Sequence, residues 1–296
     1  MALVVAPSAR ALDPILRLSQ YQKRHWQVED GLPQNYVTAI RQSADGFLAV
    51  GTAGGVARFD AVRFTPVVLR QENGASREWI TSLAFDREGA LWIGSRDAGV
   101  FRHAQGETRP VPRPDTDVAA LAIDASGAVI AFGGQGVFRW DGGRFVNIAS
   151  RFGPTDLSWQ GLAAEDDGTS LVASDRGVFR VRPGRVTLLA AATPLTGPAF
   201  SVARDRKGQL WMGAAAGLFQ VLRTDGAPPR KVHGVYGPVT GILADRDGSV
   251  WAATWGRGIY RVTAGGVERW TSADGLPDDF VHALFEDREG NLWIGG

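Results

Sequence analysis

The fold of this chain is decided by the stretch F-V-H-A-L-F-E-D-R-E-G-N-L-W-I-G-G at residues 280–296. Apolar residues alternate with others from Val281 to Phe285, which is the period of two that a β-strand requires. Residues 287–290 (Asp-Arg-Glu-Gly) indicate a tight turn, because Asp can bond its own backbone and Gly supplies a positive φ. Residues 292–294 (Leu-Trp-Ile) suit a buried strand. The stretch therefore predicts a strand, an acidic turn and a second strand.

The same unit recurs along the chain at a nearly constant spacing. Close copies begin at Asp86, Asp205 and Asp245, and weaker copies surround three further glycines. Self-similarity with a period near 40 residues, built from strands, is typical of the blades of a propeller. The predicted turn glycines, which lie 38 to 43 residues apart, are Gly46, Gly89, Gly127, Gly168, Gly208, Gly248 and Gly290.

Each unit also predicts a third and a fourth strand. The third begins with glycine and an aliphatic residue, as in Gly99-Val100-Phe101-Arg102, and an outer strand follows it. Four strands with short connections form an antiparallel meander, which is one blade. We therefore predict an all-β fold, a seven-bladed β-propeller of four-stranded antiparallel blades. Its last blade is incomplete, because the chain stops after the second strand of that unit, and is completed in part by an N-terminal strand.

The N-terminal region supplies that strand. Residues 24–33 align with residues 268–277, and both segments contain Trp five residues before the Gly of Asp-Gly-Leu-Pro. Residues 22–29 are thus expected to form an outer strand that joins the last unit and closes the ring, which removes open sheet edges. The third strand of the last unit is left unaccounted for. Either the natural chain continues past Gly296, or the N-terminal strand moves inward and the last blade has three strands; we favour a chain cut from a longer protein.

Domain boundaries and compartment follow from the ends and the composition. We expect residues 1–19 to be a signal-peptide remnant or a disordered lead, because a short apolar run precedes Ala9-Arg10-Ala11. Residues 20–296 are expected to form a single propeller domain, a fragment of a longer receptor. The net charge of +1 argues against a nucleic-acid partner. The sequence contains no run of 18 apolar residues, so it predicts no membrane span within this chain. The lack of cysteine excludes disulfides and thiol chemistry.

These residues resemble a known family. The segment from Trp26 through Asp30-Gly31-Leu32-Pro33, followed by Gly46, Gly51-Thr52 and Gly55–Phe59, is similar to the two-component regulator propeller repeat. The later Asp-x-x-Gly-x-Leu-Trp-Ile-Gly units match it too. Ile130 and Leu171 replace the repeated Trp in the third and fourth units, which departs from the pattern.

The resemblance implies a function. It implies a non-catalytic periplasmic sensor, the input domain of a receptor that continues into a membrane helix and a histidine kinase, diguanylate cyclase or DNA-binding output. The implied partners are a small molecule or oligosaccharide, or a neighbouring receptor domain, in a dimeric full-length receptor. Membrane attachment would come only from segments outside this chain.

The residues themselves show little catalytic chemistry. The four histidines are scattered without metal-ligand spacing, and we expect no metal and no cofactor. The Asp245–Gly248 segment resembles the start of a calcium loop, but no Glu closes it, so a structural turn is expected. The repeated Trp92, Trp211, Trp251 and Trp293 are interpreted as packing residues, because a ring used in the same way in several blades serves the core.

Aromatic and charged residues that do not repeat are better candidates for binding. In a four-stranded meander, the links between the second and third strands lie on the same face as the links between blades, and rigidly held loops are the usual place for binding residues. We expect this face to bind a ligand or to dock another domain. The candidate ligand-binding residues are Tyr36, Trp79, Arg96, Trp159, Arg176, Tyr236, Trp255, Arg257 and Phe280.

Two alternatives remain open. A propeller enzyme acting on a polysaccharide or a lactone-like substrate would need His, Asp or Glu at the pore mouth. An intracellular protein-interaction propeller would need no export. The candidates for the enzyme are Asp115, Asp117, Asp278, Asp279 and His282.

Overall fold

A computed structural model describes residues 2–6, 20–71, 74–75, 78–112, 118–134, 136–150, 159–165 and 167–296. The chain divides into two compact units. Unit 1 comprises residues 1–26, 173–179 and 188–296, and unit 2 comprises residues 27–172 and 180–187. The described residues form β-strands and short 3-10 turns, so the predicted all-β class is confirmed.

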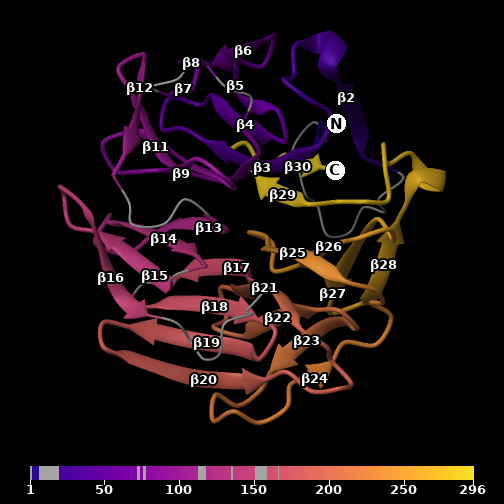
Figure 1. Cartoon of the computed structure of the whole chain (residues 1–296). Helices are drawn as coiled ribbons and strands as arrows, with labels where there is room; N and C mark the ends of the chain where they lie inside the picture. Colours follow the sequence, from indigo (N-terminus) through magenta and orange to yellow (C-terminus); the bar gives the residue numbers. More distant parts are fainter. Residues whose placement is uncertain are drawn as a thin grey trace. The chain divides into compact units, whose positions relative to one another are not determined.

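Unit 2 contains three antiparallel sheets in which the four strands follow one another in chain order (Figure 1). A two-stranded ribbon, β7 (Arg70–Gln71) and β8 (Gly74–Ala75), accompanies them. The three sheets are β3 (Val37–Gln42), β4 (Leu48–Thr52), β5 (Gly55–Phe59) and β6 (Phe64–Val67); β9 (Ile80–Phe85), β10 (Leu91–Ser95), β11 (Gly99–Ala104) and β12 (Glu107–Val111); and β13 (Ala120–Ile123), β14 (Val129–Gly133), β15 (Gly136–Trp140) and β16 (Phe145–Ser150).

Two further contiguous sheets lie in unit 1, and a sixth contributes strand segments to both units. Those of unit 1 are β21 (Ala199–Arg204), β22 (Leu210–Ala214), β23 (Gly217–Val221) and β24 (Arg230–Lys231); and β25 (Val239–Ala244), β26 (Val250–Thr254), β27 (Ile259–Thr263) and β28 (Gly266–Trp270). The sixth is β17 (Trp159–Ala164), β18 (Ser170–Ser174), β19 (Gly177–Arg182) and β20 (Arg185–Ala191).

The predicted blade count and the incomplete last blade are corrected by this topology. The chain forms six contiguous four-stranded blades, not seven. The remaining strands make a composite sheet in the order β2 (Gln22–Trp26), β1 (Ala2–Ala6), β30 (Leu292–Gly295), β29 (Ala283–Glu286). This sheet has all four strands, because β1 pairs with both β2 and β30. Figure 1 accordingly shows the N terminus beside β30.

The sequence missed β1 because the segment lacks the glycine and arginine of the other third strands. Residues 2–6 belong to the segment that we assigned to an export signal or a disordered lead, and in the structure they form a strand. The expected outer strand is present as β2, and it joins the sheet of β29 and β30 as predicted. It ends at Trp26, earlier than the predicted residue 29, because a 3-10 turn, η2 (Val28–Asp30), follows.

The acidic turns explain the repeated Trp. In four sheets the turn Asp accepts hydrogen bonds from the backbone of its own turn and from the indole of the Trp six residues later. In β25–β26, Asp245 Oδ1 accepts from the Ser249 amide at 2.8 Å, and Oδ2 accepts from Trp251 Nε1 at 2.8 Å. The same indole bond joins Asp86 to Trp92, Asp205 to Trp211 and Asp287 to Trp293. All seven predicted turn glycines have a positive φ.

Two of the blades without this Trp use an arginine instead. Asp124 accepts from Arg139 Nε at 2.9 Å, and Glu165 accepts from Arg180 Nε at 3.2 Å. Both arginines come from the third strand of their blade. Burial raises the pKa of the Asp124 carboxyl, but hydrogen bonds from Ser126 and Arg139 more than offset this, and the net pKa is lowered. In these turns the arginine side chain therefore donates to the turn carboxylate in place of the indole.

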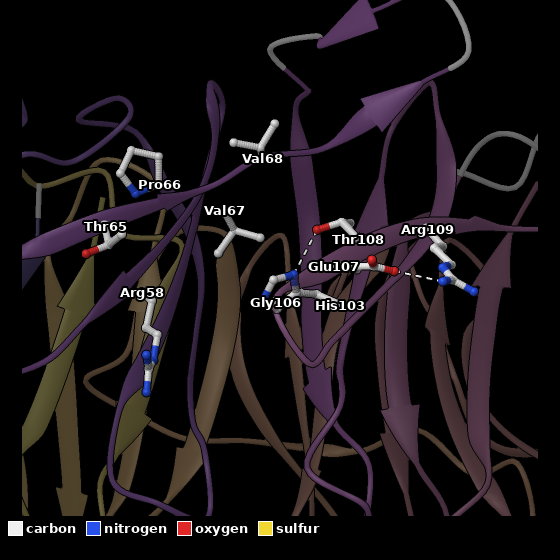
Figure 2. Close-up of a pocket in the computed structure, with 10 residues that line it drawn as sticks. All are labelled: Arg58, Thr65, Pro66, Val67, Val68, His103, Gly106, Glu107, Thr108 and Arg109. Carbon is white, nitrogen blue, oxygen red and sulfur yellow. Dashed lines mark hydrogen bonds and ion pairs between the residues drawn. The ribbon is translucent and has the colours of Figure 1, made fainter.

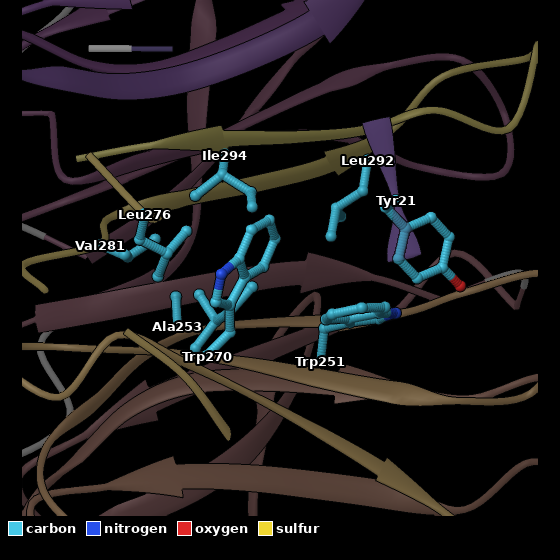
Figure 3. Close-up of a cluster of buried hydrophobic side chains, with 9 residues drawn as sticks. Tyr21, Trp251, Ala253, Trp270, Leu276, Val281, Leu292 and Ile294 are labelled. Atoms are coloured by element: carbon cyan, nitrogen blue, oxygen red, sulfur yellow. The ribbon is translucent and has the colours of Figure 1, made fainter. Parts of the chain in front are cut away.

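The core of unit 1 confirms that the repeated Trp packs inside. Trp251 and Trp270 are 0% and 1% exposed, and both lie in a cluster with Tyr21, Leu292 and Ile294. Figure 3 shows the indole of Trp270 extending toward Ile294. Burying a ring of about 200 Å² contributes about 5 kcal/mol at 25 cal/mol per Å². These aromatic rings therefore belong to the core and not to a surface site.

The two Asp-Gly-Leu-Pro segments form matching caps. The turns η2 and η3 (Ser272–Asp274) each carry a capping box, made by Gln27 with Asp30 and by Thr271 with Asp274. In each segment the Leu is buried. The second cap leads directly into the loop that carries Phe280, so it fixes where that loop begins.

Candidate functional site

The candidate site of unit 1 is built on two loops tied together by their backbones. Trp255 lies between β26 and β27, and Phe280 lies between η3 and β29. The two residues form an isolated antiparallel bridge. The amides of Gly256 and Gly258 both donate to the carbonyl of Asp279, at 3.0 and 2.8 Å. The loops therefore hold the two aromatic residues in a fixed relation.

These two loops carry an exposed cluster of aromatic side chains. The rings of Trp255 and Phe280 meet edge to face, with centroids 6.4 Å apart and planes at 77°. Trp255 is 55% exposed and Phe280 is 45% exposed. The ring of His282 lies 5.8 Å from Trp255 at 74°. We call Trp255, Phe280 and His282 the open cluster.

Two acids lie on the loop that carries Phe280. Burial lowers the pKa of the His282 imidazole, opposed by the carboxylate of Asp278, so the ring is mainly neutral at neutral pH. Asp278 also accepts the Phe280 amide at 3.0 Å, and Asp279 accepts from the amide and hydroxyl of Ser272. The acids on this loop thus hold the backbone in place.

Two further predicted residues belong to the same unit. Arg257 is exposed, and its side chain passes over Gly237, where a Cβ would lie 2.7 Å from the Arg257 Cδ. Gly237 has φ +84°, so that position is suited only to glycine. Tyr236 is 51% exposed, with Lys231 Nζ 5.4 Å from its ring centroid. Arginine, tyrosine and the open cluster together offer stacking surfaces and hydrogen-bond donors.

Three other predicted residues gather in unit 2. The rings of Tyr36 and Trp79 lie 5.5 Å apart at 60°, and the Arg96 guanidinium lies 4.0 Å from the Trp79 ring. The Arg96 amide also donates to the Trp79 carbonyl at 3.0 Å. Burial raises the pKa of the Tyr36 hydroxyl, opposed by the charge of Arg96. We call Tyr36, Trp79 and Arg96 the closed cluster, because its arginine already occupies the face of its indole.

The last two predicted residues join neither cluster. Arg176 is exposed in the β18–β19 link, where its amide donates to the Ser174 hydroxyl at 3.1 Å. Trp159 begins β17, and its side chain lies outside the described residues. Sequence reasoning treated His282 only as a candidate for the enzyme or a strand residue. Its spacing of two from Phe280 could have placed both on one face.

A cavity that the sequence did not predict lies in unit 2, along β6 and the β11–β12 hairpin. Its volume is about 680 Å³. Figure 2 shows Val67 and His103 facing the same space. His103 Nδ1 is 2.8 Å from Thr108 Oγ1, and the pKa of this imidazole is lowered by burial and by Arg58. The Arg58 guanidinium lies 3.3 Å from the ring centroid of Phe47. No sequence motif marks this cavity, whose lining residues come from third and outer strands of two blades.

The residues that the structure describes contain no group of three or more His, Cys, Asp or Glu that could hold a metal ion. None of their helices is long and apolar enough to cross a membrane. The enzyme candidates Asp115 and Asp117 lie outside the described residues.

A comparison with protein families identifies the repeat. The model of the two component regulator propeller matches residues 74–97 and 275–296. The predicted resemblance is confirmed, since both stretches contain the acidic turn followed by Leu-Trp-Ile-Gly. The second stretch also contains the whole loop of Phe280 and His282. No curated protein matches the chain.

Solved structures share the fold at low identity. The chain is 18% identical, with a TM-score of 0.73, to the extracellular domain assigned to the hybrid two component system BT3049 from B. thetaiotaomicron. The match covers 92% of this chain but only 40% of that one. A virginiamycin B lyase from Staphylococcus aureus, in a catalytically inactive form with quinupristin, is 15% identical with a TM-score of 0.72. That match covers 89% and 96% of the two chains. PorZ, a surface component of the type-IX secretion system of Porphyromonas gingivalis, is 18% identical with a TM-score of 0.69, over 93% and 48%. These likenesses establish a β-propeller fold.

Proposed function

Because the chain carries two-component regulator propeller repeats, we propose that it is the ligand-binding input module of a bacterial signalling receptor and works outside the cytoplasm. The likeness to an extracellular domain of a two-component system supports the location. The chain spans 40% of that domain, so the rest of such a receptor would supply the output.

The observation that carries the proposal is the exposed Trp255–Phe280 pair. The loops that carry these rings are held by backbone hydrogen bonds. Ligand binding to such rings therefore costs little conformational entropy, because the side chains and loops are already ordered. Two rings at 77° present one face and one edge, which suits the apolar face of a sugar ring. The neutral His282 beside them can donate or accept a hydrogen bond. The ligand class supported best is therefore a small molecule or oligosaccharide with an apolar face and hydroxyl groups.

In the proposed mechanism, ligand binding changes the contact between the loops that carry Trp255 and Phe280 and a neighbouring receptor domain or second copy. Ligand bound over Trp255 would also cover Phe280, and the Phe280 loop is tied to β30 through the amide of His282, which donates to the Gly295 carbonyl at 2.8 Å. A ligand shifts the receptor only by its differential affinity for the two states. The partner surface in a dimeric receptor would therefore lie next to the open cluster.

The test is binding of defined oligosaccharides to the whole chain. We would titrate cellohexaose, maltohexaose and tetragalacturonate, following tryptophan fluorescence and calorimetric heat. At least one should saturate the wild-type chain and be lost in the Trp255→Ala, Phe280→Ala double variant. The Trp79→Ala variant serves as the control, because it removes a Trp from the closed cluster. Equal binding by wild type and double variant would rule out the open cluster as the site.

An enzyme is the second candidate, and the virginiamycin B lyase likeness together with His282 favours it. The Asp278 carboxylate opposes the lowering of the His282 pKa, and a histidine paired with an acid is what general base catalysis uses. Quinupristin is the concrete substrate to try, because it accompanies the lyase in the solved structure. We expect no turnover. Turnover that disappears in His282→Ala and Asp278→Asn would replace the sensor proposal with an enzyme.

A further inference from the structure

The cavity along β6 and the β11–β12 hairpin lies between two blades of unit 2, β3–β6 and β9–β12. A second cavity of about 400 Å³ shares Arg58, Val67 and His103 with it. That second cavity reaches Phe85 and the buried Leu91. Val67 and Phe85 are partly buried and pack against one hydrophobic core cluster. The two cavities therefore form one recess with an apolar floor, which we call the interblade recess.

Strand alternation places Arg58 and His103 on the two sides of this recess. Val56 and Phe101 lie two residues before them and belong to the same core cluster. Because side chains two residues apart point to the same face of a strand, Arg58 and His103 extend from that core into the gap between the blades. Figure 2 shows Arg58 on β5 and His103 on β11. The two side chains can therefore contact one ligand.

The turn of the first of these blades lacks the acid that other third-strand arginines reach. Ser43 occupies the turn position of Asp86, because the amide of each donates to the carbonyl four residues later. Ala49 takes the place of the repeated Trp, and it pairs with Arg58. In the next blade, Arg102 Nε lies 3.7 Å from Asp86 Oδ2. Arg58 is thus an arginine of the repeat that has neither the turn acid nor the indole of the repeat.

Weaker contacts hold the Arg58 side chain in place. Its guanidinium lies 3.3 Å from the ring centroid of Phe47, and one nitrogen lies 3.4 Å from Asp45 Oδ2. The side chains of this ion pair are 52% and 64% exposed, and exposed ion pairs are weak because water screens them. A guanidinium has five N–H donors, so Arg58 keeps donors for a ligand while it contacts Asp45.

His103 is a second departure from the repeat. The matching third-strand position in the other contiguous blades carries Phe59, Trp140, Val181, Val221 or Val262. The repeat therefore does not account for an imidazole here. His103 Nδ1 is 2.8 Å from Thr108 Oγ1. No described residue hydrogen-bonds Nε2, which is left to donate to a ligand when Nδ1 accepts from the Thr108 hydroxyl.

Two similar cavities between other blades have no histidine among their described lining residues. One of about 520 Å³ in unit 2 is lined in part by Arg102 and Trp140. Another of about 710 Å³ in unit 1 is lined in part by Gln220 and Val262. Each offers an apolar side chain where the interblade recess offers His103. A gap between blades is thus a feature of the repeat, whereas a guanidinium and an imidazole together distinguish this one.

We propose that the interblade recess binds a small carboxylate with an aromatic or aliphatic body. The carboxylate accepts hydrogen bonds from the Arg58 guanidinium and from His103 Nε2, and the body lies against Val67 and Phe85. A guanidinium matches the two oxygens of a carboxylate, and the imidazole adds a further donor. The cavity volume of about 680 Å³ falls within the range of about 300 to 1,000 Å³ that small-molecule sites span.

The charges of the recess favour a carboxylate over a phosphate. Arg109 also lines the recess, but it already pairs with Glu107 at 2.7 Å. Asp45 lies beside Arg58, so a ligand with two negative charges would meet more repulsion than one with a single charge. The site involves none of the residues of the open cluster, and it does not rest on the oligosaccharide proposal.

Ligand binding to the whole chain tests the recess. The probes are 4-phenylbutyrate and octanoate, with 4-phenylbutyramide as the uncharged match, followed by calorimetry and by ligand-detected nuclear magnetic resonance. We expect saturable binding of at least one carboxylate. The amide should bind at least about tenfold more weakly than 4-phenylbutyrate, because the charge-assisted hydrogen bonds are lost. This comparison needs no variant, so it stands even where a substitution disturbs folding.

Two substitutions copied from other blades test the residues. Arg58→Gln copies Gln220, and His103→Val copies Val262, so both new side chains suit the strand position. Each should weaken carboxylate binding by about tenfold or more. His103→Val should not lower the urea midpoint, which separates loss of binding from loss of fold. Arg102→Gln, at the matching position of the next blade, is the control and should change binding less than about twofold.

Several results would overturn the proposal. These are no saturation by either carboxylate, equal binding of the acid and the amide, and wild-type binding by both Arg58→Gln and His103→Val. Displacement of the carboxylate by an equal concentration of inorganic phosphate would also overturn it, because phosphate has no apolar body. The Trp255→Ala, Phe280→Ala double variant should bind the carboxylate like wild type. Loss of binding there would place the carboxylate at the open cluster instead.

Discussion

The open and closed clusters use the same residue types in different ways. In the closed cluster Arg96 lies 4.0 Å from the Trp79 ring, and Trp79 is partly buried. In the open cluster Trp255 is more than half exposed, and its ring contacts are Phe280 and His282. In each cluster, one residue comes from the loop between the second and third strands of a blade, and another comes from the loop that leads into a first strand. The same two loops therefore carry the aromatic residues in both places. Whether the Trp ring can bind a ligand depends on which side chain already covers it.

The largest expected effect concerns stability in the closed cluster. Trp79→Ala should lower the free energy of unfolding by about 2 kcal/mol, because it removes a partly buried indole together with its contacts to Tyr36 and Arg96. Trp255→Ala should lower it by less than about 1 kcal/mol, because most of that ring is already in water. Urea unfolding of both variants measures the difference. Equal losses would show that the two clusters are packed alike.

The next effect is on ligand binding, where the Trp255 substitution is expected to matter more than the Trp79 substitution. Trp255→Ala should weaken oligosaccharide binding about 30-fold, the loss of roughly 2 kcal/mol typical of an aromatic hot spot. Trp79→Ala should change it less than about threefold, since Arg96 already occupies that ring. Calorimetric titration with the saccharide that binds wild type gives both values. Stronger dependence on Trp79 would place the site in unit 2.

A smaller effect should follow from the cation over the Trp79 ring. Arg96→Ala should cost about 0.5 to 1 kcal/mol, the range for a cation–π contact at an exposed site. It should also raise the pKa of Tyr36 further, because the charge that opposes the burial effect is gone. Arg257→Ala is the matched control and should leave that pKa unchanged. Absorbance titration of tyrosine ionisation reports the shift, and no shift would mean that Arg96 does not act on Tyr36.

The smallest effect separates the clusters by pH. The pKa of His282 is lowered, so the unfolded chain binds a proton near pH 6.5 before the folded chain does, and stability falls as pH drops below that value. The pKa of Tyr36 is raised, so stability at the closed cluster falls as pH rises above about 10. His25 and His103 also have lowered pKa values and add to the acid slope. His282→Gln should therefore reduce, not abolish, the loss of stability between about pH 6.5 and 5. An unchanged slope would contradict the lowered pKa of His282.

Much of the fold could be predicted because its signals are local. The Asp-x-x-Gly-x-Leu-Trp unit encodes its own turn and strand alternation, and the six contiguous blades follow from it. The residue that replaces a lost indole was not predicted, since Arg139 lies fifteen residues from Asp124 and meets it only through strand pairing. The third strand of the composite sheet was not predicted for the same reason. β1 carries no repeat pattern, and only its pairing with β2 and β30 identifies it.

The candidate site could be predicted only in part. Alternation and meander topology placed Trp255 and Phe280 on one face, and the structure brings them together. The sequence could not distinguish them from Tyr36, Trp79 and Arg96, because exposure depends on which side chain covers a ring.

The sequence by itself determined the repeating unit, its acidic turns and the buried Trp, because each depends on residues close together in the chain. The tertiary structure decided which aromatic rings stay open and how the two chain ends share a sheet. Those outcomes depend on contacts between segments far apart in sequence, which no local pattern specifies.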